Sequence, residues 1–183
     1  MTSRRPRAIV VGTSCSGKTT VARRISDASG IPHIELDALF WGSNWTPSPR
    51  DEFLERVRRA VEGDEWVLDG NYSYTRAVTW PRATHLMWLN LPFRVVLWRS
   101  VKRTFGRLIT QEEMWAGNTE SFRVAFSRNS IIWWVITTYK RRKRRYRKII
   151  DENRYPHLKI YETKKASEID AAISELTELR SGL

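Results

Sequence analysis

Short apolar runs alternate with longer amphipathic segments along this chain. Five runs have the length and the apolar content that are typical of buried strands, at 8–11, 33–36, 66–68, 85–91 and 158–161. Between the first two, Val21, Ala22 and Ile25 recur at helical spacing and share one face. Because strands that alternate with helices favour parallel pairing, the pattern predicts an α/β fold, with a five-stranded parallel sheet sandwiched by helices.

The same spacing predicts the other helices. We expect Ser48-Pro49 to cap a helix that carries Phe53 and Val57 on its buried face. A long helical stretch is predicted at 122–150, and a closing helix at 167–180.

The segment 93–108 has the clearest two-sided pattern. Trp98 and Phe105 lie on its apolar face, which we expect to be buried. Three arginines, spaced by four residues, lie on the opposite face: Arg99, Arg103 and Arg107. Like charges at this spacing repel one another, so we expect an anion to neutralise them; a solvated helix face is the alternative.

The first strand leads into a motif of the form G-x-x-x-x-G-K-[ST]. It runs from Gly12 to Thr19 and opens the first helix, as that motif requires. Its glycines let backbone N–H groups face phosphate oxygens at the positive end of the helix. We expect Lys18 to reach the outer phosphates and the Thr19 hydroxyl to bind Mg²⁺. The motif therefore predicts a site for a nucleoside triphosphate.

Two carboxylates follow strands that end at the same edge of the predicted sheet. Ligands of open parallel sheets bind beyond the carboxyl ends of the strands, so Asp37 and Asp69 should face the phosphate loop. Asp69 is a candidate Mg²⁺ ligand, and Asp37 is a candidate to orient or deprotonate an acceptor hydroxyl. A plain loop or turn aspartate remains the alternative at each position. His33 and His85 are expected to be core or strand-end histidines.

Composition narrows the class of protein. The chain has 183 residues, 41% of them hydrophobic, which is enough for one packed core and excludes a disordered chain. Its single cysteine, Cys15, cannot form an internal disulfide, which favours a reducing compartment. No apolar run approaches the ~20 residues of a membrane span. These features predict a cytoplasmic protein, and no pattern in the chain predicts its oligomeric state.

Positive charge is concentrated in one part of the chain. The net charge is +12, and the segment 93–148 alone holds 15 basic and 3 acidic residues, so the remainder is neutral. Eight of the nine residues at 140–148 are basic. This run has several interpretations: a solvated helix face, a nucleic-acid contact, or an anionic membrane surface bound with the help of Trp133-Trp134. Lid arginines that close on a nucleotide, such as Arg128 or Arg142, are a further one.

The chain resembles the small P-loop kinases, the group of adenylate kinase and shikimate kinase. Within that group it is most similar to the bacterial topology modulation proteins. The resemblance rests on the phosphate loop and on four weaker motifs that extend over most of the chain: His33-Ile-Glu-Leu-Asp37 with Trp41, Trp66-Val-Leu-Asp69-Gly70-Asn71-Tyr72, Arg99-x-x-x-Arg103, and Trp115-Ala-Gly117-Asn118.

The resemblance implies a fold and a set of roles. It implies a single P-loop domain over 1–183, with a helical insert at about 38–64 on the acceptor side and a basic lid with a long helix at about 107–150. It also implies that ATP is the phosphoryl donor and Mg²⁺ the metal, that Arg99 stacks on the adenine and that Arg103 meets the phosphates. Adenylate kinases continue the Asp-Gly motif with Phe-Pro-Arg, whereas this chain continues it with Asn71-Tyr72.

The residues and the resemblance together give the following candidate site. The nucleotide-binding residues are Gly12, Thr13, Ser14, Cys15, Ser16, Gly17, Lys18, Thr19, Thr20, Arg99 and Arg103. The catalytic residues are Lys18, Asp37 and Arg103; the acceptor-binding residues are Asp37, Asn71 and Arg76; the metal ligands are Thr19 and Asp69.

Two main functions are compatible with this site. The first is an ATP-dependent phosphotransferase that moves the γ-phosphate to a small-molecule or nucleotide acceptor. The second is a nucleic-acid-binding protein gated by nucleotide, in which the run 140–148 contacts phosphates. A peripheral membrane protein is a third interpretation.

Overall fold

The computed structural model describes residues 5–110, 115–117 and 130–181. Its centre is a sheet of five parallel strands in the order β2-β3-β1-β4-β5. The strands are β1 (Arg7–Gly12), β2 (His33–Glu35), β3 (Trp66–Asp69), β4 (His85–Leu89) and β5 (Lys159–Thr163). The predicted fold class, a five-stranded parallel sheet between helices, is therefore confirmed.

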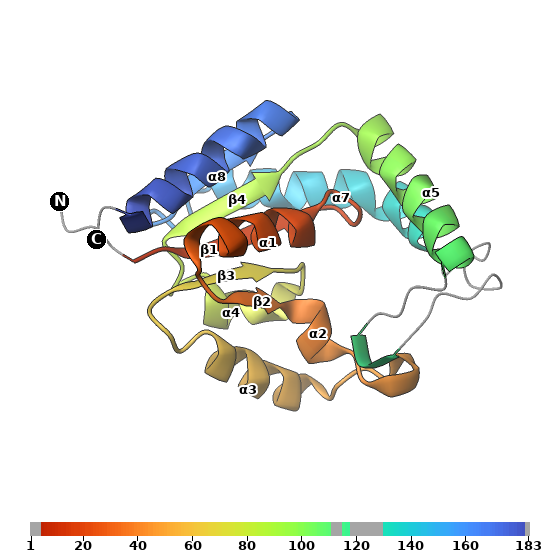
Figure 1. Cartoon of the computed structure of the whole chain (residues 1–183), viewed down its shortest axis with the longest axis horizontal. Helices are drawn as coiled ribbons and strands as arrows, with labels where there is room; N and C mark the ends of the chain where they lie inside the picture. The colour runs from red at the N-terminus through yellow and green to blue at the C-terminus, as the bar shows by residue number, and fades with distance from the viewer. Residues whose placement is uncertain (1–4, 111–114, 118–129, 182–183) are drawn as a thin grey trace.

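Seven α-helices and three short 3-10 turns are described around the sheet in Figure 1. The α-helices are α1 (Lys18–Ser29), α2 (Leu36–Phe40), α3 (Arg50–Ala60), α4 (Arg76–Thr79), α5 (Phe93–Thr110), α7 (Ile131–Asp151) and α8 (Ala166–Ser181). The 3-10 turns are η1 (Ser43–Trp45), η2 (Ser73–Thr75) and η3 (Trp115–Gly117). No described helix is both long enough and apolar enough to traverse a lipid bilayer.

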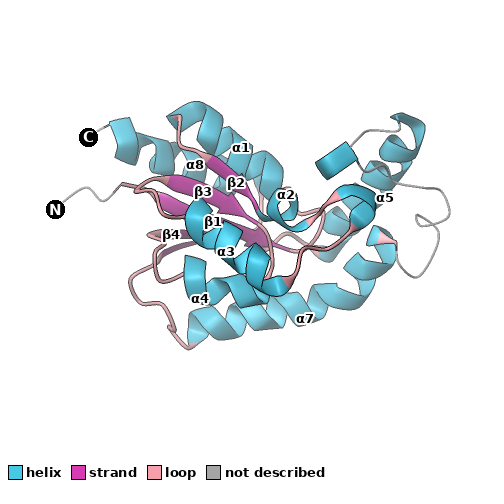
Figure 2. Cartoon of the chain, turned by 90° about the horizontal axis from the view of Figure 1, so that it is seen from below, coloured by secondary structure: helices cyan, strands magenta, loops and turns pink. Residues whose placement is uncertain are grey.

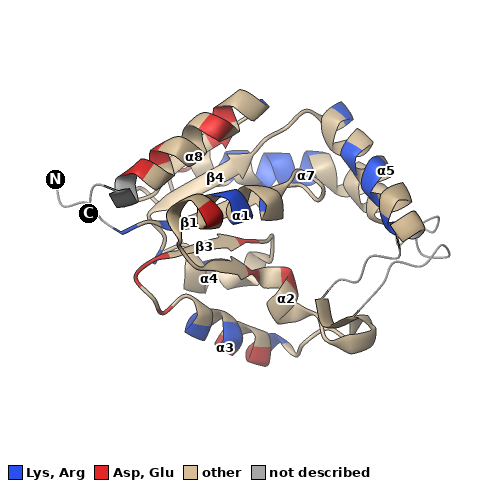
Figure 3. Ribbon diagram, viewed as in Figure 1, with Lys and Arg blue, Asp and Glu red and all other residues tan. Residues whose placement is uncertain are grey.

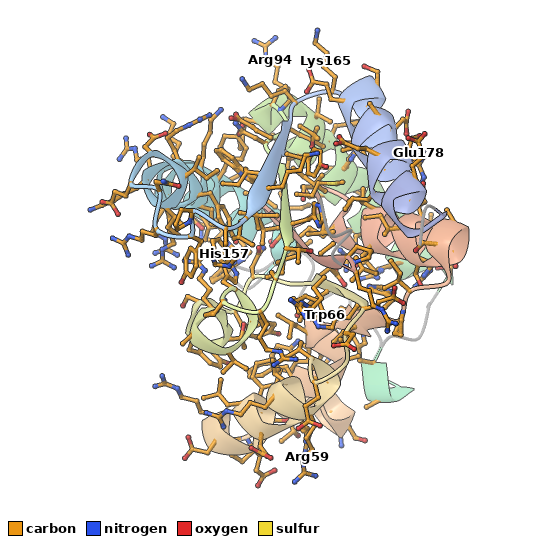
Figure 4. All side chains as sticks on the ribbon, turned by 90° about the vertical axis from the view of Figure 1, so that its left-hand side faces the viewer. Arg59, Trp66, Arg94, His157, Lys165 and Glu178 are labelled. Atoms are coloured by element: carbon orange, nitrogen blue, oxygen red, sulfur yellow. The ribbon has the colours of Figure 1, made fainter. Side chains whose placement is uncertain are left out.

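Alternate residues of the strands face two separate cores. Ala8 and Val10 of β1 pack with residues of α1 and α8, whereas Ile9 and Val11 pack with residues of α3 and α7. Figure 2 shows the same division, with α1 and α8 on one side of the sheet and α3, α4 and α7 on the other. Trp66, fully buried at the start of β3, lies inside the molecule, while Arg59 and Lys165 lie at its edge (Figure 4).

The helix α7 belongs to the core as well as to the edge of the molecule. Its buried residues include Val135, near its start, and Tyr146 and Ile149, near its end. Tyr146 and Ile149 pack in the same core as Trp88 of β4. The part of the predicted helix at 122–129, which includes Phe122 and Phe126, lies outside the described residues, as does Arg128.

Three predictions about individual elements were wrong. Pro49, not Ser48, precedes the first turn of α3, and no side chain caps that helix. The second error concerns a strand end: β4 ends at Leu89, two residues before the apolar run does, because Pro92 has no N–H group with which to continue the ladder.

The third error concerns the buried face of α5. Trp98 is 67% exposed and Phe105 is 49% exposed, whereas Val96, Ser100 and Thr104 are buried. Small side chains allow one helix to approach its neighbour closely, and α5 packs along α7. The arginine face of α5 is thereby turned toward the carboxyl ends of the strands.

Candidate functional site

A cleft opens at the carboxyl ends of the strands, where the phosphate loop, α2, α5 and α7 meet. Its volume is about 1400 Å³, larger than the pocket that one drug-sized ligand needs, so it has room for two ligands. Two of its lining side chains are carboxylates, Glu35 and Asp37. Nine are basic: Lys18, Arg23, Arg76, Arg99, Arg103, Arg107, Arg141, Arg142 and Arg145. Figure 3 shows basic residues along both α5 and α7. This charge favours anionic ligands.

The loop between β1 and α1 is folded tightly at the floor of this cleft. Cys15 and Gly17 both have positive φ angles, of 61° and 95°. Helix α1 begins at the next residue, Lys18. The Lys18 ammonium donates a hydrogen bond to the Thr13 carbonyl oxygen at 3.2 Å. Ser14, Cys15, Gly17, Lys18, Thr19 and Thr20 line the cleft, and Gly12, Thr13 and Ser16 are buried beneath it. The first N–H groups of α1 therefore lie at the floor of the cleft, where they can donate hydrogen bonds to phosphate oxygens.

Lys18 is held in an environment that disfavours its charge. Burial lowers the pKa of the Lys18 ammonium, and the carboxylates of Asp69 and Asp37 oppose that shift. Arg142 on α7 adds to the lowering. A phosphate group bound here would supply the counter-charge that the ammonium lacks.

Side-chain oxygen atoms gather beside the start of α1. The Thr19 hydroxyl donates to the Asp69 Oδ2 atom at 2.7 Å, and Glu35 Oε1 lies 3.4 Å from the same hydroxyl. His33 Nε2 is 2.9 Å from Asp69 Oδ1, which fixes the other carboxylate oxygen. Asp69 is only 3% exposed. The sequence predicted Thr19 and Asp69 together. It predicted His33 only as a core or strand-end histidine, and His33 does begin β2, but it gave neither His33 nor Glu35 a role in the site.

Asp37, in α2, is also fixed by a neighbour. Tyr72 donates its hydroxyl hydrogen bond to Asp37 Oδ1 at 2.6 Å, and both residues line the cleft. Burial raises the pKa of Tyr72, and the nearby Asp37 carboxylate raises it further. The phenol therefore stays protonated and remains a hydrogen-bond donor to Oδ1 of Asp37. This hydrogen bond fixes the orientation of the carboxylate, including that of its second oxygen.

The arginines of α5 cover the phosphate loop. Arg99 donates to the Ser16 carbonyl oxygen at 2.9 Å, and Arg103 Nη1 lies 4.0 Å from the Cys15 sulfur. Within the described residues, Arg103 Nε is buried and has no hydrogen-bond partner. Burial raises the pKa of the Cys15 thiol, and the charge of Arg103 opposes this effect. Arg99 and Arg103 thus lie beside the phosphate loop, and their contacts with the adenine and the phosphates stay a prediction.

Asn71 connects the phosphate loop to α7. Its amide nitrogen donates to the Gly12 carbonyl oxygen at 2.5 Å, and its amide oxygen accepts from the Tyr146 hydroxyl at 2.8 Å. The guanidinium of Arg76 lies 5.2 Å from the centre of the Tyr146 ring. Asn71 and Arg76, both proposed from the sequence to bind the acceptor, line the cleft. Both also contact Tyr146 of α7, which the sequence did not predict.

Two groups of lining residues were missed by the sequence reasoning. Arg141 and Arg145 lay in a run with several interpretations, and only the turn of α7 directs them into the cleft. The second group is aromatic: Phe40, Trp41, Trp45, Tyr74, Trp115 and Trp134. The Trp41 and Trp45 rings are 5.6 Å apart, and Trp45 and Trp115 are 6.3 Å apart. For Phe40, Trp41 and Trp45, the density of aromatic residues at 40–45 was the available signal.

No family model matches this chain, and no curated protein matches it in sequence. Solved structures do match. A shikimate kinase from Acinetobacter baumannii, in complex with shikimate, superposes with a TM-score of 0.56 at 18% identity and covers 98% of this chain and 96% of its own. The fold is that of the small P-loop kinases.

Two more structures support this assignment. A gluconokinase from Sinorhizobium meliloti has a TM-score of 0.54 at 18% identity, with 98% of this chain and 95% of that chain covered. A shikimate kinase from Aquifex aeolicus has a TM-score of 0.53 at 17% identity, with 96% of each chain covered. The predicted resemblance to the small P-loop kinases is confirmed at the level of the fold, and the narrower resemblance to topology modulation proteins stays a prediction.

Proposed function

We propose that this protein is an ATP-dependent phosphotransferase that moves the γ-phosphate of ATP to an acceptor hydroxyl. One observation carries the proposal: the phosphate loop, an oriented carboxylate and a row of arginines converge on one cleft that has room for two ligands. The structures of similar fold are kinases for small molecules, which agrees with this chemistry.

In this proposal the loop N–H groups and Lys18 hold the phosphates of the donor, while Arg99 and Arg103 lie over them. Phosphoryl transfer concentrates negative charge on the transferred oxygens, so its catalysis depends on positioning and on positive charge. The buried Arg103 Nε, which lacks a partner in the described residues, is a donor available to that charge. Asp37 accepts the proton of the acceptor hydroxyl. The Tyr72 hydroxyl, which donates to Asp37 Oδ1 at 2.6 Å, holds this carboxylate in its orientation.

The oxygen donors beside α1 fit Mg²⁺. Mg²⁺ prefers hydroxyl and carboxylate oxygens and commonly uses one or two protein ligands together with water and phosphate. Thr19 and Asp69 supply such a pair, 2.7 Å apart, and His33 holds the other oxygen of Asp69. These two residues would hold the ion, which would neutralise charge on the donor phosphates.

In this proposal, two segments around the cleft have different roles. The helical region at about 38–64 forms the acceptor side, since Phe40, Trp41 and Trp45 line the cleft there. The region at about 107–150 acts as a basic lid and includes the long helix α7. Residues 111–114 and 118–129 of this region are not among those that the structure describes.

ATP binding by titration calorimetry, with MgCl₂ present, tests the proposal. Replacing Lys18 by alanine should weaken ATP binding by about 100-fold, because a charge-assisted contact to phosphate is lost. Lys102→Ala is the matched control, since Lys102 is exposed and does not line the cleft. Equal ATP affinities for both variants and the wild type would refute the proposed function.

A further inference from the structure

The basic run 140–148 is divided by the turn of α7 rather than displayed on one face. Arg141, Arg142 and Arg145 line the cleft. Lys140, Lys143 and Arg144 line a separate depression of about 530 Å³ on the outside of the helix, together with Arg147 and Lys148 and with two carboxylates at its far end, Asp151 and Glu152. The run therefore supplies positive charge both to the cleft and to the surface beyond it.

The two basic surfaces join along one side of the helix. Arg141, Arg144, Arg145 and Lys148 are spaced by three or four residues, so they are neighbours on the helix surface. Within the described residues, neither Arg141 nor Arg144 nor Arg145 takes part in an ion pair, whereas Arg147 pairs with Glu162 at 2.6 Å and Lys148 with Glu152 at 3.6 Å. The result is a continuous band of cations that begins in the cleft and leaves it around α7.

Aromatic rings accompany this band inside the cleft. The guanidinium of Arg142 lies 5.6 Å from the centre of the Trp134 ring, and both side chains line the cleft. Trp41, Trp45 and Trp115 form a chain of rings on the α2 side. Aromatic rings beside a path of cations are what single-stranded nucleic acids bind, because bases stack on the rings and phosphates follow the cations.

We propose that the acceptor is a single-stranded nucleic acid, whose terminal hydroxyl enters the cleft while the strand follows the basic band around α7. This inference rests on the proposed phosphotransferase function and names its substrate class. A small acceptor would contact the cleft cations alone and leave the outer cations without a ligand. A flat membrane surface cannot follow a band that curves into a cleft, and a duplex keeps its base faces stacked away from Trp45 and Trp115.

The transfer itself balances without a further reactant. The terminal hydroxyl oxygen forms a bond to the γ-phosphorus of ATP as the bond from that phosphorus to the β,γ-bridging oxygen breaks. The hydroxyl proton passes to the Asp37 carboxylate and then to water. The products are a strand with a terminal phosphomonoester and ADP.

Radiolabel transfer from γ-labelled ATP to thymidine and to oligo-dT of three and ten nucleotides tests the acceptor class. The ratio kcat/KM should rise at least about tenfold from thymidine to the ten-mer, because each further phosphate meets another cation. Ten-mers blocked by phosphate at the 5′ or the 3′ end identify the hydroxyl that is used. Shikimate, gluconate and nucleoside monophosphates serve as small acceptors.

A surface variant separates the strand path from the cleft. The triple variant Lys140→Gln, Lys143→Gln, Arg144→Gln should raise KM for the ten-mer about tenfold and leave the affinity for ATP unchanged. The slope of log KM against log salt should fall by about 2, since single strands lose about 0.7 for each phosphate contact removed. The control variant Arg58→Gln, Arg59→Gln, Lys165→Gln removes the same charge from exposed positions outside both basic surfaces and should behave as the wild type.

Several outcomes would overturn the inference. Transfer to a small acceptor with inert oligonucleotides would leave the phosphotransferase standing and refute the nucleic-acid acceptor. Oligonucleotides that bind without being phosphorylated would make the strand a partner rather than a substrate and refute it too. Unchanged KM in the α7 triple variant would remove the proposed path. Failure of the wild type to bind ATP would refute both the function and the inference.

Discussion

At the scale of single residues, Gly70 shows how closely the end of β3 approaches α2. A Cβ atom at Gly70 would lie 2.6 Å from the Leu36 Cβ atom, and the backbone φ there is +144°. Both the contact and the conformation disfavour any other residue. This close approach keeps Asp69 and Asn71 beside the phosphate loop.

We expect Gly70→Ala to destabilise the protein by about 3 kcal/mol, from the clash with Leu36 and the strained backbone. Urea unfolding monitored by circular dichroism measures the change. Gly106→Ala in α5 is the control, because no described residue beyond the neighbouring backbone of α5 itself comes within 4 Å of the added Cβ. Alanine favours a helix, so the control should be neutral or stabilising by up to about 1 kcal/mol. Equal losses in the two variants would contradict the packing argument.

The Tyr146 hydroxyl is the link from α7 to the phosphate loop. Tyr146→Phe removes the donor to Asn71, which itself holds Gly12, so we expect ATP affinity to fall severalfold and stability to fall by about 1 kcal/mol. Calorimetry with ATP and urea unfolding measure these two quantities.

Tyr139→Phe on the same helix is the matched control. Its hydroxyl donates to the Leu91 carbonyl oxygen at 2.9 Å, and its side chain does not line the cleft. The control should lose similar stability but keep the wild-type affinity for ATP. If both variants bound ATP equally, Tyr146 would have only a structural role.

At the scale of elements, α7 depends on how it begins. Ser130 precedes the first turn, and its hydroxyl oxygen accepts from the Trp133 backbone N–H at 3.2 Å. The following run of like charges gives the helix little stability of its own, so the cap and the buried Val135 and Tyr146 hold it.

Ser130→Ala should therefore lower the free energy of unfolding by about 1 kcal/mol, because a helix N–H group loses its acceptor. Ser130→Thr keeps an acceptor oxygen and should lose less. Midpoints of urea unfolding compare the two variants. A loss in Ser130→Thr as large as in Ser130→Ala would show that the hydroxyl does not act as a cap.

At the scale of the whole molecule, His85 links global stability to pH. It is buried at the start of β4, beside Thr84 and stacked on the Tyr161 ring. Burial lowers the pKa of His85 to about 4, the positive charge of Lys159 adds to the lowering, and Glu175 opposes it.

Between the ordinary histidine pKa of about 6.5 and the folded value of about 4, the unfolded chain binds more protons than the folded chain. Stability should therefore be fully present above pH 6.5 and should fall as pH decreases, by about 3 kcal/mol at pH 4 from this residue. Urea unfolding at several pH values measures the slope. His85→Gln should flatten the slope over this range, and an unchanged slope would exclude His85 as its source.

The sequence by itself determined the sheet and the phosphate loop. Both depend on interactions between residues that are near in the chain: the apolar runs fix the strands, and the glycines with Lys18 fix a turn that opens a helix. Asp69 and Asp37 could be placed at one edge because parallel strands end on the same side. Their exact partners, such as His33 for Asp69 and Tyr72 for Asp37, were not predictable from spacing.

Only the tertiary structure decided which face of each helix meets the cleft. The apolar face of α5 looked buried, but small residues pack against α7 and leave Trp98 exposed. The basic run of α7 looked uniform, but the helix turn divides it between the cleft and the outer surface. The physical reason is that side chains of one helix are assigned to solvent or ligand by contacts with distant segments, and periodicity within one segment carries no information about those contacts.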